Sequence, residues 1–183
     1  MNAARRETTV SVTLSVPECI YYQLVYRLRR SDPFPEVSVP GYAYHFLSGP
    51  GAAWDLRRAM AGHFRSVGLL KACAKLATRD RTFYCLTAGE HLANFGWVTA
   101  SHCRYYRIEA GEVVIGPVWT DPQHRGKGLA TAGLQNAVNS LIARGHSVFY
   151  IDTSKDNLAM QKVIARCGFG PPLALFWKGP QAG

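Results

Sequence analysis

Apolar and polar residues alternate along several short stretches of the chain, and this period of two is typical of β-strands. Thr8–Val16 shows the clearest alternation, between apolar and hydroxyl-bearing side chains. Thr82–Ala88 and Leu92–Ala100 are joined by Gly89-Glu90-His91, which indicates a hairpin. The pattern predicts strands over 8–16, 82–88, 92–100, 113–119, 148–153 and 173–177.

Other stretches carry apolar residues at helical spacing. Pro17 suits the first turn of a helix, and Gly145 is a typical residue after the end of one. The spacing predicts helices over 17–30, 52–78 and 129–144. A last helix would be capped by Ser154 or Asp156 and would end at Gly168.

The stretch between Ser31 and Gly51 holds four prolines, three glycines and several aromatic residues. Linkers rarely carry so many aromatic residues, so we expect a long ordered loop here. Pro117 should kink or bulge its strand, because proline cannot donate a hydrogen bond to a neighbour. Strands and helices interleave without a repeat, which predicts one α/β or α+β domain over residues 1–183.

The 183 residues carry 21 Lys+Arg against 12 Asp+Glu, a formal charge of +9. This excess predicts an anionic partner: nucleic acid, a phosphorylated small molecule, an acidic carrier protein or a membrane surface. The densest basic stretch lies between Arg57 and Arg81. No run approaches the ~20 apolar residues of a membrane helix, and the first residues lack the apolar segment of a secretory signal.

Five cysteines at wide, irregular spacing fit reduced thiols better than a disulfide framework, and they predict a cytoplasmic protein. Cys85 and Cys103 are expected to be buried structural thiols, since the side chain of His102 would point to the opposite face of a strand from Cys103. No spacing typical of metal ligands is present, so we expect no metal site.

The segment Thr120–Ala130 lies between an expected strand and the expected helix 129–144. Gly126 and Gly128 let the backbone turn tightly and approach a ligand closely. The helix that follows offers unpaired N–H groups and the positive end of its dipole, and Arg125 and Lys127 add full charges. These features predict a phosphate or pyrophosphate site. The alternative is a glycine-rich surface turn that caps a helix.

The glycine spacing differs from that of the two common phosphate loops. Lys127 is not followed by Ser or Thr, as a Walker loop requires, and Thr131 stands where the dinucleotide fingerprint needs a third glycine. The spacing Gln123-x-x-Gly126-x-Gly128 instead resembles the Q/R-x-x-G-x-G/A signature of the GNAT acyltransferase superfamily.

A second likeness lies further along the chain. In this superfamily the loop and its helix are followed by a strand and then by a helix that opens with Asn and closes on Gly-Phe. Here the strand 148–153 precedes Asn157, and Gly168-Phe169 follows eleven positions later. The resemblance is sharp over about Glu112 to Phe169, and it implies a sheet of mostly antiparallel strands, splayed at an acyl-CoA site and flanked by helices.

The resemblance also implies roles for individual residues. The backbone of Val118 and Thr120, freed by the splay, would pair with the pantetheine arm of acetyl-CoA. Asn157 would contact the cofactor near its thioester. The pyrophosphate would be held by the loop and the start of its helix: Gln123, Arg125, Gly126, Lys127, Gly128, Leu129 and Ala130.

Glu112 is the expected general base. It stands eleven residues before Gln123, which is the spacing of the catalytic Glu in a histone-acetyltransferase branch of the superfamily. A carboxylate within reach of the acceptor amine can take its proton. The alternative is that Glu112 is a solvated turn residue. His102, Glu109 and Asp152 are weaker candidates for the same role, and Asp152 sits one residue from the end of its strand, where it could equally point to solvent.

One departure from the family pattern concerns the general acid. Many members place a Tyr seven residues after the Asn, where it protonates the departing thiolate, and here that position is Ile164. Either Tyr150, Ser154 or water serves instead, or the thiolate leaves unassisted, which its low pKa permits.

The resemblance implies an acetyl-CoA-dependent N-acetyltransferase in which the acceptor amine attacks directly in a ternary complex. We expect an acceptor site built from the 31–51 loop, the helix after it and the strand around Trp97–His102. This region is basic, which favours an anionic small-molecule amine, such as an amino sugar or a phosphorylated metabolite, over a polycation. The alternatives are an acyl carrier protein as donor and a non-catalytic acyl-CoA-binding module; nucleic-acid binding ranks last.

Overall fold

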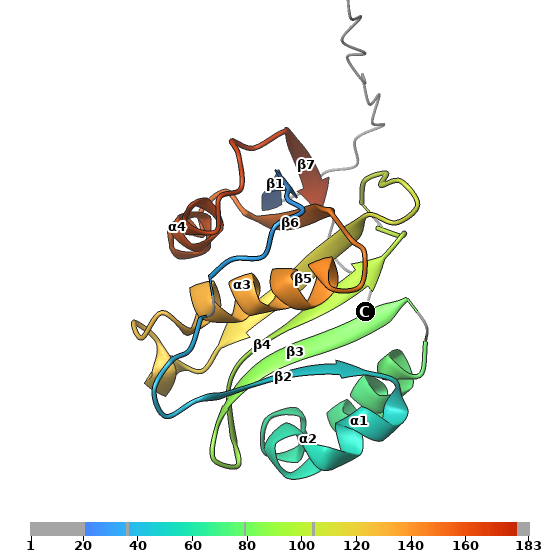
Figure 1. Cartoon of the computed structure of the whole chain (residues 1–183), viewed down its shortest axis with the longest axis vertical. Helices are drawn as coiled ribbons and strands as arrows, with labels where there is room; N and C mark the ends of the chain where they lie inside the picture. Colours follow the sequence, from blue (N-terminus) through green and yellow to red (C-terminus); the bar gives the residue numbers. More distant parts are fainter. Residues whose placement is uncertain (1–20, 36, 79, 104, 179–183) are drawn as a thin grey trace, which may run out of the picture.

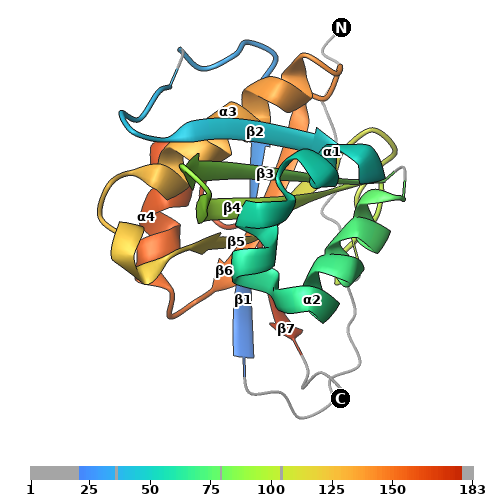
Figure 2. The ribbon, with the colours of Figure 1, turned by 90° about the horizontal axis from the view of Figure 1, so that it is seen from below.

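The computed structural model describes residues 21–35, 37–78, 80–103 and 105–178. Its centre is one mixed sheet in the order β2-β3-β4-β5-β6-β1-β7, in which β5 and β6 run parallel and the other neighbouring pairs are antiparallel. The strands are β1 (Tyr21–Arg29), β2 (Ala43–Ser48), β3 (Arg81–Ala88), β4 (His91–Ala100), β5 (Val113–Thr120), β6 (Val148–Ser154) and β7 (Ala174–Lys178). The helices are α1 (Pro50–Asp55), α2 (Arg57–Leu76), α3 (Leu129–Ile142) and α4 (Leu158–Arg166). Helices α1 and α2 cover one face of the sheet, and α3 and α4 cover the other (Figure 1 and Figure 2).

Most of the predicted elements are present, and the expected fold class is confirmed. The hairpin of β3 and β4, the helix α3 and the strands β5, β6 and β7 all lie where the hydrophobic pattern placed them. The predicted cap of the last helix is wrong, because Asn157 caps α4 by accepting a hydrogen bond from the N–H of Met160 at 3.1 Å. None of the helices in the described part of the chain has the length and apolar character that crossing a bilayer requires.

The predicted helix 17–30 is wrong where the structure describes it. Residues 21–29 form β1, which pairs with β6 on one side and with β7 on the other. Val25, Tyr26 and Leu28 are buried, and consecutive residues in a strand point to opposite faces. The strand is therefore covered on both faces of the sheet. Pairing with β6 and β7 and burial on both faces decide its structure, although its apolar residues also fit helical spacing. The predicted strand 8–16 lies outside the described residues.

The expected long loop 31–51 is irregular only in its first half, and its second half contains β2 and the start of α1. Residues 31–35 and 37–42 are irregular, whereas Ala43–Ser48 forms β2 at the edge of the sheet, beside β3. The irregular half is fastened to α3 by two asparagines. Asn139 accepts a hydrogen bond from the Phe34 N–H at 2.7 Å and donates one to the Phe34 carbonyl at 3.1 Å, and Asn136 donates to the Val37 carbonyl at 2.8 Å.

The predicted helix 52–78 is divided into α1 and α2, and α2 itself is broken. At Arg65 the backbone has φ 55° and ψ 178°, which is not helical. The two parts of α2 therefore run in different directions over the sheet (Figure 2). The C-terminal part of α2 ends at Leu76, shortly before β3 begins at Arg81, and it packs through Ala72 and Leu76 against β3 and β4.

Strands β5 and β6 separate after three residue pairs. Val113–Ile115 pairs with Phe149–Ile151, and the pairing ends there. Beyond this point β5 stays beside β4 as far as Asn94↔Thr120, and β6 stays beside β1 as far as Gln23↔Ser154. The register of β5 against β4 shifts at Gly116 and Pro117, so the bulge expected at Pro117 is confirmed. The sheet therefore opens between its two parallel strands.

Helix α3 lies close to the sheet because two glycines face the same tyrosine. Tyr84 on β3 pairs directly with Gly96 on β4, and its ring is fully buried under α3. A Cβ on Gly133 of α3 would lie 3.1 Å from the ring of Tyr84 and 2.5 Å from the side-chain oxygen of Asn94. Small residues at both positions thus set the distance between α3 and the sheet.

We expect Gly96→Ala to lower the free energy of unfolding by about 1–3 kcal/mol, as overpacked cores do. The new Cβ would lie 2.5 Å from the Cζ atom and the hydroxyl oxygen of Tyr84, and the buried ring has no room to move. Chemical denaturation measures the effect. Gly62→Ala is the matched control, since a Cβ there meets nothing within 4 Å and alanine favours a helix. A Gly96→Ala protein as stable as the control would contradict this account of the packing.

Candidate functional site

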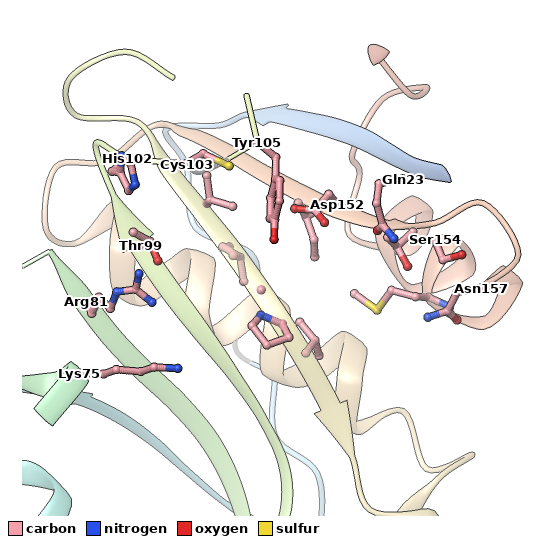
Figure 3. Close-up of a pocket in the computed structure, with 18 residues that line it drawn as sticks. Gln23, Lys75, Arg81, Thr99, His102, Cys103, Tyr105, Asp152, Ser154 and Asn157 are labelled. Atoms are coloured by element: carbon pink, nitrogen blue, oxygen red, sulfur yellow. The ribbon is translucent and has the colours of Figure 1, made fainter. Parts of the chain in front are cut away.

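The gap between β5 and β6 holds a cavity of about 530 Å³, which we call the splay cavity. Its floor is β5 from Val114 to Val118, and β6 contributes Ile151 to Ser154. Residues from the end of α2, the start of β3 and the segment after β4 complete it (Figure 3). A cavity of this size suits a small molecule.

The two walls of the splay cavity differ in charge. Lys75, Arg81 and His102 line one wall, and Asp152 and Ser154 line the other (Figure 3). Lys75 is held partly by Trp97, with its ammonium 5.2 Å from the ring centroid. The cavity can therefore bind an anionic group on one side and a cationic or amine group on the other.

Asp152 has a tyrosine partner at the rim of the cavity. The Tyr106 hydroxyl donates to Asp152 Oδ2 at 3.4 Å, and the Tyr106 ring lies 6.0 Å from that of Tyr150. Burial, followed by the negative charge of Asp152, raises the pKa of Tyr106. Tyr106 therefore stays protonated and acts as a donor, which orients the Asp152 carboxylate.

A second cavity of about 470 Å³, the loop cavity, lies where β5 ends and α3 begins. It is lined by the turn from Thr120 to Thr131 and by one side of α4. Val118, Asn157 and Met160 line both cavities, so the two meet at the mouth of the splay.

The turn at the loop cavity presents backbone to the solvent. Gly126 and Gly128 both have φ near +77°, a conformation that favours glycine, and a Cβ on either would meet nothing within 4 Å. Asp121 caps the preceding turn by accepting from the Gln123 N–H at 2.8 Å. Arg125 donates from Nε to the Thr120 carbonyl at 3.3 Å, so its guanidinium is held beside the turn. Backbone N–H groups and a guanidinium are donors that suit a pyrophosphate.

The structure brings most of the expected cofactor residues together. Those that line the loop cavity are Val118, Thr120, Arg125, Gly126, Gly128, Leu129, Ala130 and Asn157. Gln123 and Lys127 belong to the same turn but do not line the cavity; both are exposed. Asn157 is placed at the junction of the cavities by the cap that it forms on α4.

Glu112 does not line either cavity. It precedes β5, is half-buried, and its Oε2 accepts the Glu109 N–H at 2.8 Å across a tight turn. Its backbone carbonyl accepts from the Ser101 N–H at 2.9 Å. Among the carboxylates that the sequence singled out, Asp152 is the one in the splay cavity.

Several lining residues were missed or misplaced by sequence reasoning. Gln23 comes from β1, which was expected to be a helix, and none of the described residues of the 31–51 segment lines the splay cavity. Cys103 is not buried as expected: β4 ends at Ala100, so His102 and Cys103 both line the cavity. Burial raises the pKa of Cys85 to about 12, as a structural thiol requires.

The position of the usual family tyrosine lies in the core. Ile164 is fully buried between α4 and the sheet, among the residues that pack under α3. Of the substitutes considered, Ser154 lines the splay cavity, whereas Tyr150 does not.

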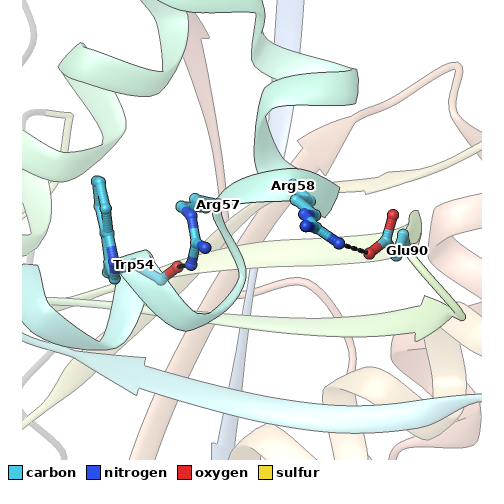
Figure 4. A network of polar contacts seen from close by, with 4 residues as sticks. All are labelled: Trp54, Arg57, Arg58 and Glu90. Carbon is cyan, nitrogen blue, oxygen red and sulfur yellow. Dashed lines mark hydrogen bonds and ion pairs between the residues drawn. The ribbon is translucent and has the colours of Figure 1, made fainter.

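The basic stretch from Arg57 to Arg81 serves two different surfaces. Arg57 donates to the Trp54 carbonyl at 2.9 Å and stacks on its ring, and Arg58 pairs with Glu90 at 2.7 Å (Figure 4). These contacts are on the exposed side of α1 and α2, where such pairs contribute little to stability. Lys75 and Arg81 instead face the splay cavity.

Solved structures of acetyltransferases share this architecture. A GNAT-family acetyltransferase of Novosphingobium aromaticivorans is 19% identical, with a TM-score of 0.54, 86% of this chain covered and 64% of that one. A GCN5-related N-acetyltransferase of Kribbella flavida is 15% identical, with a TM-score of 0.60, 91% of this chain covered and 60% of that one. The chain thus spans about three fifths of the length of these two. The aminoglycoside N-acetyltransferase AAC(6')-Iy in complex with CoA is 15% identical, with a TM-score of 0.57, 76% of this chain covered and 100% of that one.

At these identities the likeness concerns the fold, and no curated protein matches the sequence. The family evidence comes from the sequence itself. The model of the acetyltransferase (GNAT) family matches residues 54–169, a range that runs from α1 to the end of α4 and includes the whole turn at the loop cavity. Because this match takes in more than half of the 183 residues, the chain belongs to the GNAT acetyltransferase family.

Proposed function

We propose that this acetyltransferase moves an acetyl group from acetyl-CoA to the amine of a small anionic molecule, by direct attack in a ternary complex. The observation that carries the proposal is the meeting of the two cavities at Val118, Asn157 and Met160. One cavity has the donors that a pyrophosphate needs, and the other has a carboxylate and two cations. Their junction allows donor and acceptor to be bound at the same time.

The residues of the loop cavity fit acetyl-CoA, which supplies the acetyl group as an activated thioester. The N–H groups of the turn around Gly126 and Gly128 and the side chain of Arg125 would hold the pyrophosphate. The edge of β5 beyond Ile115 is not paired with β6, so its backbone groups can pair with the extended pantetheine arm of acetyl-CoA. Asn157 and Met160 stand where that arm would reach the splay cavity.

Asp152 is the group best placed to accept the proton that the acceptor amine loses. It lies in the splay cavity and is oriented by the protonated Tyr106 hydroxyl. A general base must be within hydrogen-bond reach of the proton it takes, and geometry is therefore the first criterion. Glu112, the base expected from the sequence, remains a prediction, and its carboxylate is engaged in the 109–112 turn. Ser154 or water would return a proton to the departing thiolate.

Lys75 and Arg81 support an anionic acceptor. Both cations line the wall opposite Asp152, and His102 lies beside them. A polycationic acceptor would meet like charge on that wall, which costs free energy at short range. An amine that also carries a carboxylate or a phosphate would instead place its amine near Asp152 and its anion near Arg81.

A thiol-release assay with acetyl-CoA and a panel of amines tests the proposed function. We expect turnover with small amines that bear a carboxylate or a phosphate, and weaker turnover with the matching uncharged amines and with aminoglycosides. Initial rates at varied concentrations of both substrates should give intersecting lines, as a ternary complex requires. Tight binding of acetyl-CoA without thiol release from any amine would indicate a binding module instead.

We expect Asp152→Asn to lower kcat by about 10²–10⁴-fold, the usual contribution of a general base. The amide keeps the size and polarity of the side chain but cannot accept the proton, so the affinity for acetyl-CoA should hold. Glu112→Gln is the matched comparison and should retain activity within a few-fold. Single-turnover rates and CoA binding by calorimetry separate the two effects. The reverse result, with activity lost in Glu112→Gln and kept in Asp152→Asn, would restore Glu112 as the base.

We expect Arg81→Gln and Lys75→Gln each to raise the KM for an anionic amine by about 10–150-fold, the worth of one charge-assisted hydrogen bond. The KM for acetyl-CoA should be unchanged, because neither residue lines the loop cavity. Lys71→Gln is the control, since Lys71 lies one turn from Lys75 on α2 and is outside the cavity. Equal effects of all three variants would point to the overall charge of the protein and not to a binding wall.

A further inference from the structure

The irregular segment before β2 reaches the turn of the loop cavity through one side chain. The hydroxyl of Tyr42 lies 2.8 Å from Nδ1 of His124, and the two rings meet edge to face with centroids 5.6 Å apart. Tyr42 and His124 are 82 positions apart in the sequence. This contact therefore joins two parts of the chain that no local pattern connects.

His124 itself belongs to the loop cavity. It is the last residue of the short turn Pro122–His124 and lines the cavity together with Arg125 and Gly126. The sequence motif singled out its neighbours but assigned no role to this histidine. Since Tyr42 occupies Nδ1, Nε2 is the ring nitrogen left to interact with whatever the cavity binds.

Tyr42 is held against the same helix, α3, that follows the turn of the loop cavity. It packs with Val39 against a small buried cluster that includes Leu129, the first residue of α3. Upstream of it, Asn136 and Asn139 of α3 bind the backbone of the same segment. A hydroxyl held in this way constrains the imidazole, because the segment that carries Tyr42 is anchored to the helix whose N-terminus forms the cavity.

We propose that Tyr42 is a positioning residue for acetyl-CoA binding: by donating its O–H to Nδ1, it sets the ring orientation and the tautomer of His124. A neutral imidazole has one donor nitrogen and one acceptor nitrogen. When Nδ1 accepts the Tyr42 O–H, the ring proton lies on Nε2, which becomes a donor toward an anion in the loop cavity. The opposite tautomer would present the Nε2 lone pair to the phosphate oxygens, which is repulsive.

This inference rests on the proposed function only as far as the binding of acetyl-CoA, and it makes no use of the acceptor. Tyr42→Phe is the direct test, because it removes the hydroxyl and keeps the ring. Tyr44→Phe is the matched control. Tyr44 stands two residues away and its hydroxyl lies 3.1 Å from Ser140 Oγ, in a contact that does not reach the loop cavity.

We expect Tyr42→Phe to weaken acetyl-CoA binding by about fivefold, the worth of one net hydrogen bond, as measured by calorimetry without acceptor. Tyr44→Phe should leave this affinity unchanged. The ring ¹⁵N shifts of His124, recorded with CoA bound at about pH 8, should report protonated Nε2 in the wild type and a mixed or rotated ring in Tyr42→Phe. In a His124→Ala background, Tyr42→Phe should have no further effect on affinity.

Three results would overturn the proposal. The first is an unchanged affinity and unchanged His124 shifts in Tyr42→Phe, and the second is an equal loss in the Tyr44→Phe control. The third is a wild-type protein that does not bind acetyl-CoA, which would also remove the proposed function. A protein that binds acetyl-CoA and loses affinity on Tyr42→Phe, yet acetylates no amine, would support the positioning role and defeat the proposed function alone.

Discussion

The separation of β5 from β6 is the constraint on which the rest of the site depends. Two parallel strands that pair over Val113–Ile115 and Phe149–Ile151 would ordinarily continue side by side. Here each is kept by its other neighbour, β5 by β4 and β6 by β1, while the shift of register at Pro117 turns β5 away. A gap in a sheet exposes unpaired backbone groups, which is costly unless a partner binds them. The opening thus leaves strand edges to which an extended ligand would pair in the proposed function.

The end of β5 at the gap and the turn that follows it are both anchored by the protein. Asn94 on β4 is fully buried, and its amide donates to the Trp119 carbonyl at 2.7 Å and to the Thr120 hydroxyl at 2.9 Å. These bonds fix the end of β5 at the point where the turn of the loop cavity begins. The close approach of α3 over Tyr84 holds the other end of that turn. The position of the turn relative to the gap therefore follows from packing at a distance from any ligand.

Sequence reasoning succeeded where the chemistry is local. Gly126 and Gly128 need only their own backbone angles and the helix that follows, and this information lies within a dozen residues. It failed where the sheet order decides. Gln23 and Asp152 lie on neighbouring strands because β1 is inserted between β6 and β7, an arrangement that hydrophobic spacing does not encode. Lys75 is carried into the cavity by α2, whose break at Arg65 lies between Gly62 and Gly68; these glycines weaken a helix but do not determine the direction in which it continues.

The structure divides cations that contribute to the formal charge of +9 between the two cavities. Arg125 lies at the loop cavity, between the sheet and the helices α3 and α4, whereas Lys75 and Arg81 lie at the splay cavity on the side of α2. Two anionic ligands drawn to one cluster would repel or displace each other, since like charges at short distance interact strongly in a cavity. In the proposed function, cations on the two sides of β5 would attract the two ligands independently. The sheet would thus keep the two anions apart, while the gap at Val118 would bring their reactive ends together.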